Sequence, residues 1–138
     1  MNLESLTKQL IQIESISPND AGCFDILESA LEGMNFSCER ISYKNVENLY
    51  AVIGSQGPTL CFLGHTDVVP TGPSDQWTYP PFSGETHDDH IYGRGAADMK
   101  GNICAFIEAL GSFLKTEKLN YRIAVLLTSN EEGTPEDG

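Results

Sequence analysis

Apolar residues recur at helical spacing in three segments of the chain. Leu3, Leu6 and Leu10 lie on one face of a helix predicted over residues 2–14. A second helix is predicted from about residue 24 to Met34, with a left-handed cap expected near its end, at Gly33 or Asn35. The third is predicted over residues 99–115. Its apolar face is formed by Ile103, Phe106, Ile107, Leu110 and Leu114.

The segments between these helices have the patterns of strands and of one long loop. Residues 37–43 and 49–53 predict a hairpin with a polar turn around Lys44 and Asn45. Residues 59–63 and 122–127 are almost wholly apolar, which is typical of strands covered on both faces in the centre of a sheet. Residues 69–95 are rich in proline and glycine and predict an ordered loop. Helices that alternate with apolar strands predict the α/β class.

Length and charge narrow the function classes. The chain has 138 residues, enough for one domain or part of one, and carries a net charge of -12. This acidic balance argues against binding nucleic acid or an anionic membrane surface, because both need basic residues. The chain shows neither a membrane-length apolar run nor a signal-peptide pattern, so we expect a cytoplasmic protein. Its four cysteines form no CxxC pair and are expected to be buried, reduced thiols.

Residues capable of metal chemistry follow the ends of predicted apolar segments, where α/β folds place their ligands. His65 and Asp67 come directly after one apolar strand, and Glu131 and Glu132 follow another. Asp98 lies at the start of the third helix, between Gly93, Gly95 and Gly101. Histidine and carboxylate side chains are ligands that suit zinc, and a carboxylate that is not a ligand can accept a proton.

Each of these three segments also has a structural interpretation. His65 and Asp67 are compatible with a strand end whose aspartate is unrelated to the histidine. Asp98 is compatible with a helix N-cap, a position at which aspartate is common. Glu131 and Glu132 are compatible with a solvated acidic turn. No single segment decides between the two interpretations.

Taken together and in order, four sequence blocks resemble the co-catalytic zinc amidohydrolases, a family that includes aminoacylases, acetylornithine deacetylases, carboxypeptidase G and succinyl-diaminopimelate desuccinylases. The blocks are GHTDVVP at residues 64–70, Trp77 with Pro81-Phe82, YGRGAADMKG at residues 92–101, and TSNEEG at residues 128–133. Within the family, GHTDVVPTGP and GRGAADMKG are most similar to the desuccinylase versions. The resemblance extends from the first helix to Gly133.

The resemblance implies a fold, a metal and roles for five residues. The fold would be part of a three-layer catalytic domain with a mixed sheet flanked by helices. His65, Asp98 and Glu132 would be metal ligands, with Asp98 bridging two Zn²⁺ ions, for which Co²⁺ can substitute. Glu131 would be the general base, and Asp67 would hold His65. A cis peptide bond is expected after Asp98.

By this resemblance, the reaction would be hydrolysis of the amide of N-succinyl-LL-2,6-diaminopimelate to succinate and LL-diaminopimelate, by a homodimeric protein in lysine and diaminopimelate biosynthesis. Family members are more than twice as long and take two further ligands from downstream sequence. We therefore expect residues 1–138 to be the amino-terminal part of a catalytic domain, without the dimerisation domain and inactive alone. His87 and His90 are not expected to replace the missing ligands.

Two other hypotheses remain open at this point. The chain could belong to an acetylornithine deacetylase or an N-acyl-amino-acid aminoacylase, which share the chemistry but differ in acyl preference. It could also be a non-catalytic piece that only self-associates through exposed apolar faces and unpaired strand edges.

Overall fold

The computed structural model describes residues 2–134 and has the mixed α/β architecture expected from the sequence. Its α-helices and strands are α1 (Leu3–Ile11), α2 (Cys23–Glu32), β1 (Ser37–Tyr43), β2 (Val46–Ile53), β3 (Thr59–His65), β4 (Glu85–His87), β5 (His90–Tyr92), α3 (Gly101–Thr116) and β6 (Arg122–Thr128), and a short 3-10 helix spans Ser74–Gln76. A five-residue kinked turn, Ala96–Lys100, precedes α3. No helix among residues 2–134 is both long and apolar enough to cross a bilayer.

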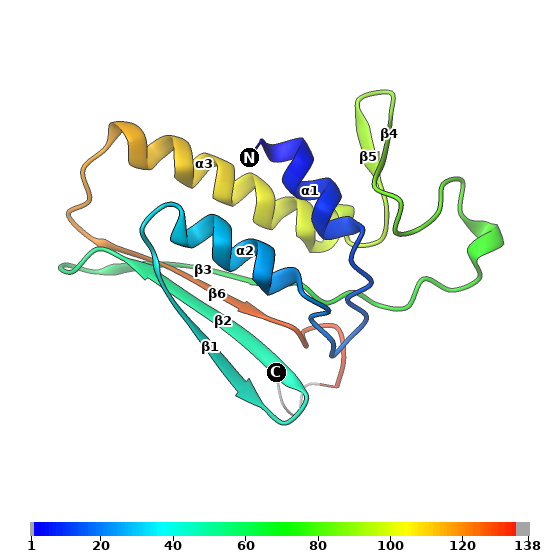
Figure 1. The fold of residues 1–138 in the computed structure, drawn as a ribbon, viewed down its shortest axis with the longest axis horizontal. Helices are drawn as coiled ribbons and strands as arrows, with labels where there is room; N and C mark the ends of the chain where they lie inside the picture. Colours follow the sequence, from blue (N-terminus) through cyan, green and yellow to red (C-terminus); the bar gives the residue numbers. More distant parts are fainter. Residues whose placement is uncertain (1, 135–138) are drawn as a thin grey trace.

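Four strands form the main sheet in the order β1-β2-β6-β3 (Figure 1). β1 pairs with β2 and β2 pairs with β6 in antiparallel fashion, whereas β3 pairs with β6 in parallel. The sheet is therefore mixed, as predicted. The predicted hairpin is confirmed, although β2 begins at Val46, three residues earlier than the sequence indicated.

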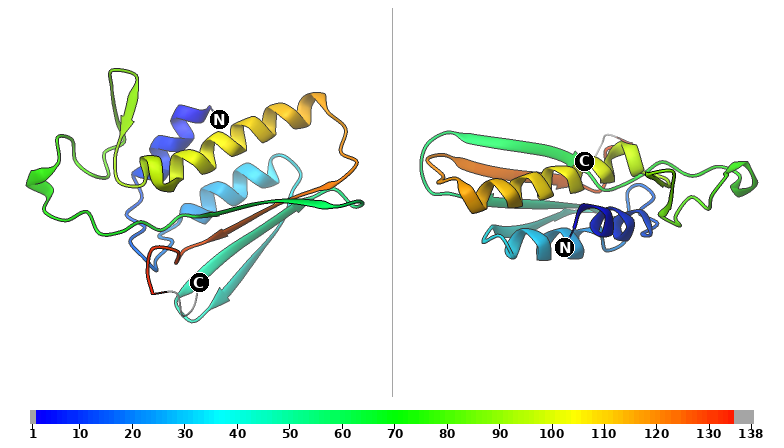
Figure 2. Two further views of the ribbon diagram at one scale, coloured as in Figure 1. Left: turned by 180° about the vertical axis from the view of Figure 1, so that it is seen from behind. Right: turned by 90° about the horizontal axis from the view of Figure 1, so that it is seen from above.

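The three α-helices all lie on one side of this sheet (Figures 1 and 2). Their apolar faces meet the inward side chains of the strands in a core that excludes water, which is the main source of stability in such a layered fold. The fully buried core side chains include Leu10, Phe24, Leu27, Ile103 and Leu127.

The position predicted for β3 in the sheet is wrong. β3 was expected in the centre of the sheet, covered on both faces, but it lies at the edge, and Leu60 and Leu63 are 58% and 65% exposed. β6 occupies the central position instead, with Ile123, Ala124 and Val125 all buried. Apolar composition alone cannot distinguish a strand that is covered on both faces from a strand with one open face. Among residues 2–134, β3 is a strand of the second kind.

Smaller details agree with the sequence expectations in most respects. The left-handed residue after α2 is Asn35, with φ of 66°, whereas Gly33 is right-handed helical. The long loop is ordered but contains the β4–β5 hairpin. Cys23 and Cys104 are buried as expected, and burial raises the pKa of both thiols, but Cys61 is exposed. The peptide bond between Asp98 and Met99 is cis, as the resemblance implied.

The different environments of β2 and β3 give a direct test of this packing. Leu49 of β2 is fully buried, so Leu49→Ala is expected to lower the free energy of unfolding by about 2–5 kcal/mol through lost burial and a residual cavity. Leu63→Ala is the matched control and is expected to change it by less than about 0.5 kcal/mol. Urea denaturation of the 138-residue chain measures both. Equal losses would contradict the edge position of β3.

Candidate metal centre

His65 is placed by the parallel pairing of β3 with β6. It is the last residue of β3 and pairs with Thr128, the last residue of β6, so both strands end at the same edge of the sheet. Gly64 brings the turn before α3 close to this edge, because a Cβ on Gly64 would lie 3.1 Å from Cε of Met99. The segments that carry His65, Asp98 and the Glu131–Glu132 pair thus converge.

Asp98 is not the N-cap of α3, the alternative that the sequence left open. It lies inside the kinked turn with non-helical φ and ψ of -130° and 101°, and the N-cap position belongs to Lys100. Its Oδ1 is instead 3.1 Å from Nε2 of His65. Lys100 anchors the turn, because its buried Nζ donates to the carbonyl oxygens of Leu10 and Ile13 at 2.7 and 2.8 Å. Burial lowers the pKa of Lys100.

Asp67 is fully buried and connects His65 with the turn after β6. The backbone N–H groups of Glu131 and Glu132 donate to its Oδ1 and Oδ2 at 3.1 and 3.0 Å. Nδ1 of His65 lies 2.9 Å from the carbonyl oxygen of Asp67 and 3.5 Å from its Oδ1. The carboxylate therefore fixes the imidazole on one side and the acidic turn on the other, as outer-shell carboxylates do in metal sites.

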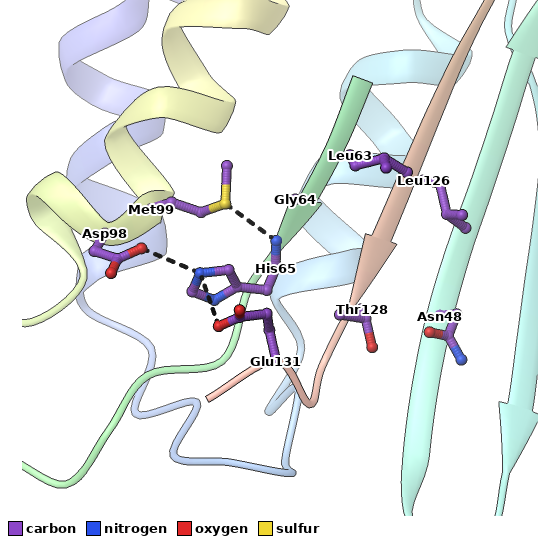
Figure 3. Close-up of a pocket in the computed structure, with 9 residues that line it drawn as sticks. All are labelled: Asn48, Leu63, Gly64, His65, Asp98, Met99, Leu126, Thr128 and Glu131. Atoms are coloured by element: carbon purple, nitrogen blue, oxygen red, sulfur yellow. Dashed lines mark hydrogen bonds and ion pairs between the residues drawn. The ribbon is translucent and has the colours of Figure 1, made fainter. Parts of the chain in front are cut away.

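The side chains of the site converge on Nε2 of His65, as Figure 3 shows for Asp98 and Glu131. One potential ligand atom from each of His65, Asp98 and Glu132 lies within 4.8 Å of the other two. Oε2 of Glu131 is 3.8 Å from Nε2 of His65. Because Asp67 engages Nδ1, Nε2 is the nitrogen left to face a cation. The structure thus brings together all five residues selected from the sequence.

The electrostatics of the buried pair follow from this geometry. Burial by itself would lower the pKa of His65, but hydrogen bonds with Asp67 and Asp98 outweigh it and raise that pKa to about 9. Burial would raise the pKa of Asp67, but hydrogen bonds from His65, Ser17 and the two glutamate amides lower it to about 2. Between these pH values the metal-free site contains an imidazolium next to a carboxylate.

An open cavity of about 530 Å³ lies in front of these groups (Figure 3). The wall formed by Leu63 and Leu126 is apolar, while Asn48 and Thr128 add polar groups. A cavity of this size with a few polar groups can hold a small polar molecule against the charged cluster.

His87 and His90 lie outside this centre. The ring of His87 stacks on Tyr79 with centroids 3.9 Å apart, and its Nε2 contacts Glu85 Oε2 at 2.9 Å. His90 is exposed, and its Nδ1 contacts the carbonyl oxygen of Asp88. Neither belongs to the ligand cluster found among residues 2–134.

Comparison with known proteins identifies the family. A profile of the peptidase family M20/M25/M40 matches residues 61–138, more than half of the chain and the part that contains all five site residues. The chain belongs to this family.

Two curated relatives of this M20 chain are both named succinyl-diaminopimelate desuccinylase. Succinyl-diaminopimelate desuccinylase from Delftia acidovorans is 51% identical over 142 residues, which cover 96% of this chain and 36% of that protein. The desuccinylase from Rhodospirillum centenum is 47% identical over 140 residues, covering 97% of this chain and 36% of that protein. The chain thus spans little more than a third of the length of these relatives.

Solved structures agree with the fold. An M20 family metallo-carboxypeptidase from Sulfolobus solfataricus is 27% identical, with a TM-score of 0.81, covering 92% of this chain and 30% of that chain. Human carnosine dipeptidase 1 has the same TM-score at 24% identity, and the match covers 91% of this chain and 31% of the dipeptidase chain. At this identity the similarity supports the fold alone.

Sequence reasoning did not identify every residue that contacts the site of this M20 chain. Ser17 is not among the residues selected from the sequence, yet its hydroxyl donates to Asp67 Oδ2. The two residues are 50 positions apart, so no spacing could have signalled the contact. Asn48 of β2 was likewise missed, because its place in the cavity depends on the order of the strands.

The His65–Asp67 pair predicts a pH-dependent stability for the metal-free M20 chain. Because the folded pKa of His65 lies above its unfolded value, protonated His65 stabilises the fold fully below pH 6.5, and this contribution is lost as the pH rises through about 9. His65→Gln should therefore cost about 1–3 kcal/mol at pH 6 and progressively less toward pH 9.

The measurement is urea denaturation in the presence of a chelator at several pH values. His90→Gln, which removes an exposed imidazole, is the control and should change stability little at any pH. A cost of His65→Gln that is independent of pH would contradict the raised pKa.

Proposed function

We propose that this chain supplies the metal-binding half-site of a hydrolase that cleaves the amide of N-succinyl-LL-2,6-diaminopimelate to succinate and LL-diaminopimelate. The observation that carries the proposal is the convergence of His65, Asp98 and Glu132 within 4.8 Å, in a chain about 50% identical to proteins named as desuccinylases. The proposal concerns the whole protein, of which the relatives indicate that this chain is a part.

The donor set fits zinc. One imidazole nitrogen and two carboxylate oxygens are ligands that Zn²⁺ accepts, and its usual coordination number of four leaves room for water or further ligands. We infer that His65, Asp98 and Glu132 would hold Zn²⁺, with two ions in the complete site, and that Co²⁺ could replace zinc. The remaining protein ligands would come from sequence beyond residue 138.

Zinc in such a site lowers the pKa of water and polarises a carbonyl group. The residues of the chain would transfer the proton and orient the metal ligand. Glu131 accepts the proton of the attacking water, as a carboxylate next to the ligands can, and passes it to the nitrogen of the leaving amine as the C–N bond breaks. Asp67 keeps His65 oriented with Nε2 outward. The remaining water oxygen and hydrogen become part of the succinate carboxyl group.

The same proposal covers the setting of the protein. The substrate is a small molecule, and the net charge of -12 makes nucleic acid and anionic membranes unsuitable partners. We infer a cytoplasmic homodimer for the complete protein, which takes part in lysine and diaminopimelate biosynthesis. The dimerisation domain would lie in the part of the complete protein that corresponds to the portion of the relatives that this chain does not match.

Zinc titration of the 138-residue chain tests the ligand set. We expect binding weaker than nanomolar, because ligands from the rest of the protein are missing, and we expect His65→Ala to abolish it. His90→Ala is the control and should retain it, since His90 lies outside the cluster. Isothermal calorimetry measures both stoichiometry and affinity. Two zinc ions bound with nanomolar affinity would contradict the need for further ligands.

The roles of the adjacent glutamates are tested in the complete product of the reading frame that contains this chain. Glu131→Gln should lower kcat by about 10²–10⁴-fold while zinc content is retained, since the variant loses only a proton acceptor. Glu132→Gln should lose zinc. Metal analysis and amine release from succinyl-diaminopimelate measure the two effects, and the opposite pattern would exchange the two roles.

Substrate class is tested with the same complete product. We expect turnover of succinyl-diaminopimelate and little turnover of acetylornithine or N-acetylated amino acids. The Delftia acidovorans desuccinylase serves as the positive control for the assay. Preference for acetylornithine would assign the chain to the deacetylases. If the complete product turned over none of these substrates while the positive control was active, the result would favour a non-catalytic role.

A further inference from the structure

The loop between α1 and α2, residues 12–22, belongs to none of the four sequence blocks, yet it lies directly against the candidate metal centre. Its backbone is joined to the segment after His65 by two hydrogen bonds. The N–H of Val68 donates to the carbonyl oxygen of Ser15 at 2.9 Å, and the N–H of Ser17 donates to the carbonyl oxygen of Val68 at 3.2 Å. This short parallel pairing, centred on Ile16 and Val68, fixes the position of Ser17 next to Asp67.

The hydroxyl of Ser17 donates to Oδ2 of Asp67. The same oxygen accepts the backbone N–H of Glu132 at 3.0 Å, and Oδ1 accepts that of Glu131 at 3.1 Å. Asp67 is fully buried, so protein donors satisfy its charge in place of bulk water. Ser17 is the side-chain donor that reaches this carboxylate from outside the four blocks.

We propose that Ser17 is a positioning residue of the metal centre. By fixing the plane of the Asp67 carboxylate, its hydroxyl sets where the Glu131–Glu132 backbone is held and how the ring of His65 is oriented. The assignment of a metal to the centre rests on the proposed function above, whereas the effect on the acidic turn does not depend on it.

The physical reason lies in the number of donors that define the carboxylate's orientation. Each Asp67 oxygen accepts one backbone N–H from the turn, so these two bonds alone let the carboxylate and the turn move together. The Ser17 bond ties the carboxylate to a third segment, which is itself fixed to Val68. Without it the turn keeps its bonds to Asp67, but one contact fewer holds the orientation of the carboxylate relative to His65.

A neighbouring serine allows this role to be separated from simple packing. Ser15 lies in the same loop, is fully buried, and its hydroxyl donates at 2.7 Å to the backbone carbonyl oxygen of Thr66. Ser15→Ala therefore removes a buried hydroxyl and one hydrogen bond two residues from Ser17, without touching the carboxylate. A general weakening of the loop would appear in both variants.

The first readout requires no metal. In the zinc-free 138-residue chain, measured by ¹H–¹⁵N NMR, Ser17→Ala should shift the amide resonances of Glu131 and Glu132 and lower their protection from hydrogen exchange by about 10-fold or more. Ser15→Ala should leave both amides close to their wild-type values. Unchanged Glu131 and Glu132 amides in Ser17→Ala would overturn the proposal.

The second readout is zinc affinity, measured by competition with a chromophoric chelator. Ser17→Ala should weaken Zn²⁺ binding about 10-fold, in the range that outer-shell substitutions produce, and Ser15→Ala less than about twofold. Equal losses in the two variants would overturn the proposal, since the effect would then belong to the loop as a whole. A wild-type chain that binds no zinc would instead contradict the proposed metal site, and the amide readout would still decide the role of Ser17.

Discussion

The buried carboxylate of Asp67 is the interaction on which the arrangement of the site depends. A carboxylate removed from water is costly unless hydrogen bonds and an opposite charge compensate it. Here the compensation comes from the Ser17 hydroxyl, from the amides of Glu131 and Glu132, and from the imidazole of His65. Three segments distant in the sequence must therefore be in place together, and the site forms only when they are.

The sheet provides the frame for this interaction. β6 lies between β2 and β3, and its parallel register with β3 places Thr128 opposite His65. The turn that follows β6 consequently begins beside the imidazole. In α/β folds the ends of adjacent parallel strands are where ligands bind, because the loops that leave them meet at one edge. Within residues 2–134, this M20 chain follows that rule with β3 and β6, the parallel pair of its main sheet.

Exposure divides the site into two parts with different tasks. The side chains of His65 and Asp67 are 6% and 0% exposed and are held by several hydrogen bonds. The side chains of Asp98 and Glu131 are 74% and 61% exposed, and each faces Nε2 of His65. The buried pair defines an orientation, whereas the exposed carboxylates remain open to the cavity, where a cation and a substrate can reach them.

The sequence by itself determined the helices, the hairpin and the α/β class, and its resemblance to a known family selected the five residues of the centre. Periodicity and short blocks such as GHTD and GRGAADMKG are local signals, and local signals are what a chain displays directly. Neither the edge position of β3 nor the packing of the helices on one face is local, because strand order depends on pairings between distant segments. The contact of Ser17 with Asp67 likewise spans 50 residues. Only the tertiary structure decided the contact between Ser17 and Asp67, since no spacing along the chain encodes which loop reaches a buried carboxylate.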